Sequence, residues 1–502
     1  MEEKLSELKR RLAEINDLNA ASLVLSWDQS TNMPPGGELA RARQLSTLRR
    51  LAHQRSSDPQ LGQLLDALQP YANGLPDDAD DACLIQVARR DYERAICIPA
   101  DFVARLSQHR AESYSAWAAA RPENDFATVQ PFLEKTLHLS RQLANFSPGY
   151  QHVADPLIDR SDEGMTVAVL RPLFAELHQQ LVPLAQAIAG AAPIDDALLH
   201  QHYPADAQWG FGLEVARRLG YDFQRGREDQ SPHPYTTRFS IGDVRITTRI
   251  DEHDLGEALF GTIHEVGHAL YEQGIAPRLE ATPLAQGTSS GVHESQSRLW
   301  ENIVGRSWGF WQFFYPHLQA AFPRQLGAVS LDAFYRAINK VQPGLIRTSA
   351  DEVTYNLHVI IRFEMELELL EGHLAVRDLP EAWRARYQAD LGITPPDDRS
   401  GVMQDVHWFS GVIGGAFQGY SLGNILSVQF YEAAVRAQPQ IPAEVERGDF
   451  GTLLGWLQEN IYRHGRKFTA AQLVERVVGG PMRIEPYMRY LRAKFGELYA
   501  IQ

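Results

Sequence analysis

Two histidines four residues apart, His264 and His268, flank Glu265 in the stretch HEVGH. On a helix such residues project from one face, so both imidazoles can bind a single metal ion. The glutamate can then take a proton from a water molecule that the metal activates. Chance would produce this pattern below roughly 0.07 times per chain of this composition. The motif therefore indicates metal-assisted hydrolysis, with His264 and His268 as metal ligands and Glu265 as the general base.

A helix must hold this motif, and the flanking residues predict one. Asp254 followed by Glu257 resembles a capping box at a helix start, and Gly274 is placed to end the helix. Apolar residues between these points recur at helical spacing and predict a buried stripe: Leu255, Leu259, Ile263, Val266 and Leu270.

A catalytic zinc site has three protein ligands and keeps a fourth position for water. The metzincin pattern would need glycine at position 271 and histidine at position 274, but the chain has Tyr271 and Gly274, which excludes that class. The next predicted helix, in SSGVHESQSRLWEN (289–302), can start at either of its two leading serines. It offers Glu294 and Glu301, which are seven residues apart and nearly on one face. The spacing leaves both glutamates open as the third ligand.

The segment TTRFSIGDVRITTRI interrupts the helical periodicity just before the HEVGH helix. Alternate residues are apolar or β-branched, as in a strand: Val244, Ile246, Thr248 and Ile250. Gly242 and Asp243 suit a tight turn. We expect an antiparallel hairpin over about 234–250, and an exposed edge of it could pair with an extended peptide.

Helical periodicity fills most of the remaining chain of 502 residues, and no repeat or long linker divides it. The sequence therefore predicts a mainly α fold and one catalytic domain over 1–502. Its expected parts are an N-terminal helical part to about 230, the hairpin, metal-binding helices over about 255–305, and a C-terminal helical part.

The net charge of -15 argues against a nucleic-acid partner. No stretch approaches the roughly 18 apolar residues of a membrane span, and the N-terminus has no apolar signal region. We expect a cytoplasmic protein that does not bind membranes. The two cysteines, Cys83 and Cys97, are expected to be reduced thiols.

Eight short segments together resemble a known family: WDQSTNMPPGG (27–37), HPYTT (233–237), DVRIT (243–247), HEVGH (264–268), HESQS (293–297), IRTSAD (346–351), GVMQDVHW (401–408) and GYSLGN (419–424). The chain resembles the carboxypeptidase Taq family of metallocarboxypeptidases, in the group of glutamate-zincins that includes angiotensin-converting enzyme. It departs from the family pattern at Tyr235, where phenylalanine is expected.

The resemblance implies that Glu294 is the third zinc ligand. Glu301 then either orients a ligand histidine or forms an ordinary ion pair. The resemblance also implies a large helical peptidase fold around a deep active-site groove, with a small antiparallel β-sheet next to the metal, and a homodimer. Zn²⁺ is the expected cofactor, and Co²⁺ also suits two histidines and a glutamate.

Peptide hydrolysis also needs a donor that stabilises the oxyanion. Tyr420 and His407 are the candidates, because each lies in a C-terminal family segment. The alternative for both is a structural role: Tyr420 would be hydrogen-bonded locally, and His407 would lie in the core.

A carboxypeptidase must hold the free α-carboxylate of its peptide substrate, which arginine does with a bidentate fork. Arg347 is the first candidate, and Arg245 and Arg249 on the strand are the second. The alternative for Arg347 is an ion pair with Asp351, four residues further along a helix. Three further residues are expected to hold the peptide backbone or to brace the site: His233, Gln404 and Asp405.

An aminopeptidase would instead need a segment of the GxMEN type, and the sequence has none. The leading hypothesis is a zinc-dependent carboxypeptidase that hydrolyses the C-terminal bond of peptides. One alternative is a groove-type metallo-oligopeptidase that cuts internal bonds. The other is a non-enzymatic helical zinc-binding interaction protein, against which Glu265 and an open coordination position argue.

Overall fold

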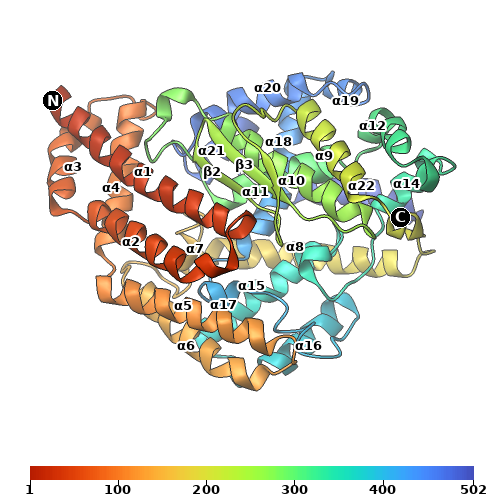
Figure 1. The fold of residues 1–502 in the computed structure, drawn as a ribbon, viewed down its shortest axis with the longest axis horizontal. Helices are drawn as coiled ribbons and strands as arrows, with labels where there is room; N and C mark the ends of the chain where they lie inside the picture. Colours follow the sequence, from red (N-terminus) through yellow and green to blue (C-terminus); the bar gives the residue numbers. More distant parts are fainter. Residues whose placement is uncertain (502) are drawn as a thin grey trace.

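The computed structural model describes residues 1–501, and helices make up most of it (Figure 1). The mainly helical fold predicted from the periodicity is thereby confirmed. The helices before the sheet are α1 (Glu2–Thr31), α2 (Glu38–Ser56), α3 (Pro59–Ala72), α4 (Asp80–Ile96), α5 (Ala100–Ala120), α6 (Phe126–Asn145), α7 (Asp155–Ile158), α8 (Val167–Ala189) and α9 (Ala205–Leu219).

One three-stranded sheet follows, in the order β1-β3-β2. Its strands are β1 (Glu228–Gln230), β2 (Thr236–Ser240) and β3 (Asp243–Thr248). The antiparallel pair β2–β3 is the predicted hairpin, but its turn is Ile241–Gly242, because Asp243 already pairs with Ser240. Strand β1 runs parallel to β3, so the sheet is mixed rather than purely antiparallel. The sequence did not reveal β1, since a three-residue polar strand has no alternation.

The helices that carry the HEVGH and HESQS segments come directly after the sheet: α10 (Leu255–Gln273), α11 (Ser290–Arg298) and a π-helix (Leu299–Val304). The remaining helices are α12 (Trp308–Ala321), α13 (Pro323–Leu326), α14 (Leu331–Ile338), α15 (Tyr355–Glu371), α16 (Leu379–Leu391), α17 (His407–Ser410), α18 (Gln418–Ala437), α19 (Ile441–Val445), α20 (Gly451–Asn460), α21 (Ala470–Val478) and α22 (Glu485–Tyr499).

Helix α18 lies between the two larger hydrophobic clusters of the molecule. Leu422 and Ile425 belong to the cluster built with α5, α6, α8, α15 and α22. Leu426 and Phe430 belong to the cluster built with α9, α10, α12 and α20. A helix that is apolar on both faces is buried all round. A smaller cluster joins α1, α3 and α4 to residues 275–285.

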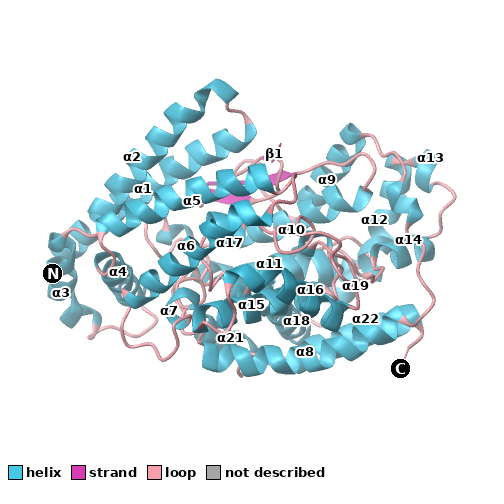
Figure 2. Ribbon diagram, turned by 90° about the horizontal axis from the view of Figure 1, so that it is seen from below, coloured by secondary structure: helices cyan, strands magenta, loops and turns pink. Residues whose placement is uncertain are grey.

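The sheet and helices α10 and α11 lie in the middle of the molecule, with α1–α4 towards one end and α12 and α14 towards the other (Figure 1). The hairpin of α1 and α2 projects from the body in the second view (Figure 2). Among residues 1–501, no helix is both long and apolar enough to span a bilayer. The single-domain organisation stays a prediction.

Candidate metal centre and active site

Helix α10 holds the HEVGH motif between the residues predicted to bound it. Asp254 caps the helix, because its Oδ1 accepts a hydrogen bond from the backbone N–H of Gly256 at 2.9 Å, and Gly274 follows the last turn. The predicted capping box is wrong in its second half, since Glu257 forms an ion pair with Arg249 at the end of the hairpin. Glu257 thus pairs with a side chain of the hairpin rather than with the backbone N–H at the start of its own helix.

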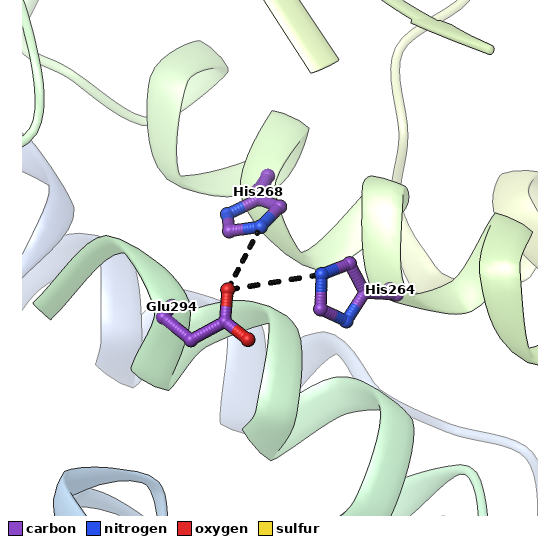
Figure 3. A group of neighbouring side chains, drawn as sticks. All are labelled: His264, His268 and Glu294. Atoms are coloured by element: carbon purple, nitrogen blue, oxygen red, sulfur yellow. Dashed lines mark ion pairs between the residues drawn. The ribbon is translucent and has the colours of Figure 1, made fainter. Parts of the chain in front are cut away.

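His264, His268 and Glu294 converge from α10 and α11 (Figure 3). Oε2 of Glu294 lies 3.8 Å from Nε2 of His264 and 3.5 Å from Nε2 of His268. Ligand atoms around a tetrahedral zinc ion are about 3.4 Å apart, given bonds near 2.1 Å. The spacing and the donor set, two neutral nitrogens and one carboxylate oxygen, therefore fit zinc.

Two glycines allow the helices to approach this closely. A Cβ atom on Gly267, inside HEVGH, would lie 2.7 Å from Cα of Ser297 on α11. A Cβ atom on Gly423 of α18 would lie 2.5 Å from Cγ of Glu294. Both contacts are shorter than van der Waals packing allows, so α11 is held between α10 and α18 only because these positions carry no side chain.

The start of α11 is fixed from far away in the sequence. Ser289 caps the helix through Oγ, which accepts from the N–H of Val292 at 3.1 Å. The buried carboxylate of Asp162 accepts from the N–H of Gly291 at 2.7 Å and from Nε2 of Gln418 at 2.9 Å. These contacts set the position of the first turn, and Glu294 projects from the next one.

Glu301 contacts the ring nitrogen of His264 that faces away from Glu294. Its Oε2 lies 2.9 Å from Nδ1 of His264 and accepts from Nη1 of Arg298 at 3.1 Å. Arg298 also donates to Oε1 of Glu294 at 2.8 Å. The sequence left two roles open for Glu301, orienting a ligand histidine or forming an ion pair. In the structure it makes both contacts, to His264 and to Arg298. It lies in the π-helix, an element that occurs frequently at functional sites.

The outer nitrogen of His268 faces another histidine. Nδ1 of His293 lies 2.6 Å from Nδ1 of His268, and Nε2 of His293 lies 2.8 Å from Oε1 of Glu272. Arg238, on β2, forms an ion pair with Oε2 of Glu272 at 3.0 Å.

The electrostatics of the cluster favour a neutral imidazole and charged carboxylates. Burial lowers the pKa of His268 to about 4. Burial alone would raise the pKa of Glu294 and that of Glu301, but Arg298 and the histidines outweigh it. The pKa of Glu294 is therefore far below its usual value, and that of Glu301 falls to about 2. For His268 and Glu294 these are the protonation states that metal ligation requires. Burial alone would lower the pKa of His264, but the carboxylates of Glu294 and Glu301 outweigh it, so this pKa is instead raised.

Strand β2 positions Glu265. Oγ1 of Thr236 donates to Oε2 of Glu265 at 2.7 Å. Glu265 is only 6% exposed, and this burial raises the pKa of its carboxyl above the ordinary value. The sheet therefore holds a carboxylate with increased basicity beside the two histidines.

Arg347 lies in a short 3₁₀ turn (Arg347–Ser349) and is buried. The predicted ion pair with Asp351 is wrong, because no helix spans these residues. Arg347 instead donates from Nη2 to Asp405 at 2.8 Å and from Nη1 to the hydroxyl of Tyr355 at 3.0 Å. The ring of Tyr355 lies 4.3 Å from the guanidinium carbon of Arg298, which holds Glu294. This chain of contacts joins Arg347 to the candidate metal ligand Glu294.

The side chains of Asp405 and Gln404 both form hydrogen bonds with other residues of the protein. Asp405 also accepts from Arg362, and although burial opposes it, the two arginines lower the pKa of Asp405 well below its usual value. Oε1 of Gln404 accepts from the N–H of Arg347 at 3.0 Å, while its Nε2 donates to the carbonyl of Leu345 at 2.8 Å. Of the two roles considered for Gln404, these contacts match bracing.

Tyr420 and His407 lie next to each other and next to Arg347. The hydroxyl of Tyr420 is 3.2 Å from Nε2 of His407, and Nδ1 of His407 is 3.5 Å from Oδ1 of Asp405. The guanidinium carbon of Arg347 lies 5.0 Å from the ring of Tyr420. Burial raises the pKa of Tyr420 above its ordinary value, so the hydroxyl keeps its proton.

The other predicted substrate residues make contacts elsewhere. Arg245 pairs with Asp243 at 2.8 Å and lies over the ring of Trp27. Arg249 pairs with Glu257. His233 is exposed at the start of the hairpin. No contact joins these three side chains to the metal cluster within the described chain.

A cavity of about 400 Å³ opens between α1–α4 and β2. Arg238 and Phe239 of β2 line it together with residues of the N-terminal helices, such as Asn19 and Tyr92. None of the three candidate metal ligands lines it, and Arg238, which pairs with Glu272, connects its wall to the contacts around His268.

Sequence reasoning missed the residues that hold the candidate ligands in place. Spacing could have found two of them, because Glu272 is four residues after His268 and Arg298 is four residues after Glu294. His293 adjoins Glu294 in HESQS. Asp162 gave no such signal. Thr236 lies in the HPYTT segment, but neither residue is near its contact in the sequence, and only the tertiary fold brings them to the site.

Comparison with known proteins gives consistent matches over nearly the whole chain. A family model described as carboxypeptidase Taq (M32) metallopeptidase matches residues 7–495. Thermostable carboxypeptidase 1 of Thermus thermophilus is 41% identical over 507 residues, 99% of this chain and 98% of that protein. Carboxypeptidase 1 of Bacillus subtilis is 36% identical over 491 residues, 98% of this chain and 97% of that protein.

The crystal structure of an M32 carboxypeptidase from Deinococcus radiodurans R1 matches with a TM-score of 0.96 at 49% identity, over 99% of both chains. The resemblance seen in the sequence segments is thereby confirmed for the chain as a whole. The chain belongs to the carboxypeptidase Taq (M32) family and is a metallocarboxypeptidase, a metal-dependent hydrolase of peptides.

Proposed function

We propose that this protein is a zinc-dependent carboxypeptidase that removes residues from the free C-terminus of peptides, with Glu265 as general base. The observation that carries the proposal is the convergence of His264, His268 and Glu294, whose ligand atoms all lie within 4.8 Å of one another, beside the buried carboxylate of Glu265. Three ligands of this kind leave a coordination position open, as catalytic rather than structural zinc sites do.

Zinc held by these residues would supply Lewis-acid polarisation of the scissile carbonyl and lower the pKa of a bound water towards ~7. Glu265 accepts the proton of the attacking water on a carboxylate oxygen and returns it to the leaving amine. The hydrogen bond from Thr236 fixes the direction in which that carboxylate points.

Tyr420 and His407 supply the donor to the oxyanion in this proposal. The hydroxyl of Tyr420 keeps its proton, because burial raises its pKa, and His407 orients it from 3.2 Å. Of the two, the hydroxyl of Tyr420 is the favoured donor to the oxyanion, because it can accept from Nε2 of His407 at 3.2 Å and keep its own O–H free to donate.

Arg347 binds the α-carboxylate of the substrate in this proposal. It is buried close to Tyr420 and is linked through Tyr355 and Arg298 to Glu294. Arg245 and Arg249 are less favoured, because their ion pairs lie in the hairpin region and no contact in the described chain joins them to the candidate metal ligands. A positive charge at this depth recognises the C-terminal carboxylate of a peptide, as a carboxypeptidase requires.

Product analysis tests the proposal. Peptides blocked at the N-terminus are incubated with the enzyme as purified, after chelation, and after addition of zinc. We expect single residues released in order from the C-terminus, loss of release after chelation, and recovery with zinc. Internal fragments would support the oligopeptidase alternative. Zinc binding without any cleavage would support the non-enzymatic one.

The homodimer and the cytoplasmic location also stay proposals. The homodimer rests on the family resemblance alone. For a chain of 56.4 kDa, sedimentation or light scattering distinguishes monomer from dimer directly. A monomer at micromolar concentration would contradict the expectation.

A further inference from the structure

A chain of polar contacts runs from candidate metal ligand His268 into the protein. It passes through His293, at 2.6 Å between the two Nδ1 atoms, and reaches Glu272, at 2.8 Å from Nε2 of His293. Arg238 ends it by pairing with Glu272 at 3.0 Å. Glu272 is 6% exposed, so bulk water does not replace these contacts.

Only one arrangement of protons satisfies the chain when His268 binds a metal through Nε2. The proton of His268 must then be on Nδ1, which donates to Nδ1 of His293. The proton of His293 must be on Nε2, which donates to the carboxylate of Glu272. If either imidazole adopts the other tautomer, two acceptors or two donors face each other and a buried hydrogen bond is lost.

We propose that His293 and Glu272 are positioning residues for His268: they fix its proton on Nδ1 and so present its Nε2 to the metal. The inference rests on the metal site proposed above. It also distinguishes the two ligand histidines, because His264 faces the carboxylate of Glu301 directly, whereas His268 reaches its carboxylate through a second histidine.

Zinc affinity of the full-length protein, measured by competition with a chromophoric chelator, tests the proposal without relying on turnover. His293→Phe retains a ring that can pack against Tyr271, which lies 5.4 Å from it, but it offers no acceptor. We expect this variant to bind zinc about 10–100-fold more weakly. His293→Gln offers an amide oxygen to Nδ1 of His268 and should recover part of the affinity.

A second pair of variants probes Glu272 independently. Glu272→Met removes the acceptor for Nε2 of His293 and should weaken zinc binding, whereas Glu272→Gln keeps an acceptor and should bind more tightly than Glu272→Met. The matched control is Glu371→Met. Glu371 lies in another His–Glu–Arg set, 2.8 Å from Nε2 of His152 and paired with Arg171, but that histidine is not a candidate ligand. Its zinc affinity should equal that of the wild type.

The outcomes separate this inference from the proposed metal site. If His268→Ala loses the zinc of the wild type while His293→Phe and Glu272→Met bind zinc as the wild type does, the positioning role is wrong and the metal site stands. The positioning role is equally wrong if these two variants only lower the melting temperature of the metal-free protein. If His268→Ala binds zinc as tightly as the wild type, both proposals fail.

Discussion

At the scale of single residues, hydrogen bonds hold the guanidinium group of Arg347 in the orientation that its proposed role requires. Asp405 takes hydrogen bonds from Nε and Nη2, and Tyr355 takes one from Nη1. A guanidinium group has five N–H donors, so donors on both terminal nitrogens stay available in a fixed orientation. A fixed fork loses little entropy when it binds a carboxylate.

Replacing Arg347 with lysine tests this role. Lysine keeps the charge but loses the fork and its hold on Asp405, so kcat/KM for peptides with a free C-terminus should fall about 10–100-fold, through KM. Peptides with an amidated C-terminus are the control, because they lack the carboxylate, and their slow turnover should change little. An equal loss for both kinds of peptide would contradict carboxylate recognition by Arg347.

Glu366 predicts a pH dependence of stability that is separate from catalysis. This carboxyl accepts from Nε1 of Trp408 at 2.9 Å, and burial raises its pKa from 4.5 to about 7. Because its folded pKa lies above its unfolded pKa, the folded state loses stability as pH rises from about 4.5 to about 7. The loss is at most about 3 kcal/mol for one group.

The variant Glu366→Gln keeps the acceptor for Trp408 and cannot ionise. Its melting temperature relative to the wild type should therefore be higher at pH 8 than at pH 5. The measurement is calorimetry of both proteins at both pH values. A difference that is the same at the two pH values would show that Glu366 does not carry this dependence.

At the scale of elements, the convergence of the three candidate metal ligands depends on how closely three helices pack. Gly267 leaves no side chain between α10 and α11, and Gly423 leaves none between α18 and Glu294. The glycine in HEVGH and the second glycine in GYSLGN therefore have the same function, although they lie 156 positions apart in the chain.

Gly423→Ala should disturb the ligand directly. The new methyl group would lie 2.5 Å from Cγ of Glu294, so the carboxylate must shift or the helices must separate, at a cost of about 1–3 kcal/mol. We expect weaker zinc binding and a lower melting temperature. Gly455→Ala in α20 is the matched control, because a Cβ atom there meets nothing within 4 Å. It should be neutral or slightly stabilising. Unchanged zinc affinity in Gly423→Ala would contradict the packing argument.

The elements also show what sequence patterns can reveal. The HEVGH helix, the serine that starts α11 and the hairpin were predictable, because each is specified by residues within a few positions of one another. Three other features could not be predicted: strand β1, the contact of Asp162 with α11, and the chain of contacts from His268 to Arg238. Their partners come together only in the folded chain, and Arg347 was misplaced on a helix for the same reason.

At the scale of the whole molecule, the C-terminal helix α22 holds the segment that carries Arg347. Lys494 forms a buried ion pair with Glu352 at 2.7 Å, and both side chains are less than a tenth exposed. Tyr487 of α22 accepts from Nδ2 of Asn356 at 2.7 Å, and Tyr499 accepts from the N–H of Val341 at 2.7 Å. Helix α22 therefore stabilises the segment on both sides of Arg347.

Lys494→Met should destabilise the protein by about 3–5 kcal/mol, because the carboxylate of Glu352 is left buried without its partner. The double variant Lys494→Met/Glu352→Gln removes that charge and should recover part of the loss. Thermal unfolding of the three proteins checks this. A double variant that is less stable than Lys494→Met would contradict the ion-pair explanation.

The proposed mechanism makes Glu265 the general base at a zinc site built by His264, His268 and Glu294. The most direct measurement combines zinc content with the turnover of an N-blocked peptide in Glu265→Gln. We predict an unchanged zinc content per chain and a kcat that is lower by about 10²–10⁴-fold, since glutamine can occupy the position but cannot accept the proton. A variant that holds zinc and cleaves at the wild-type rate would contradict this mechanism.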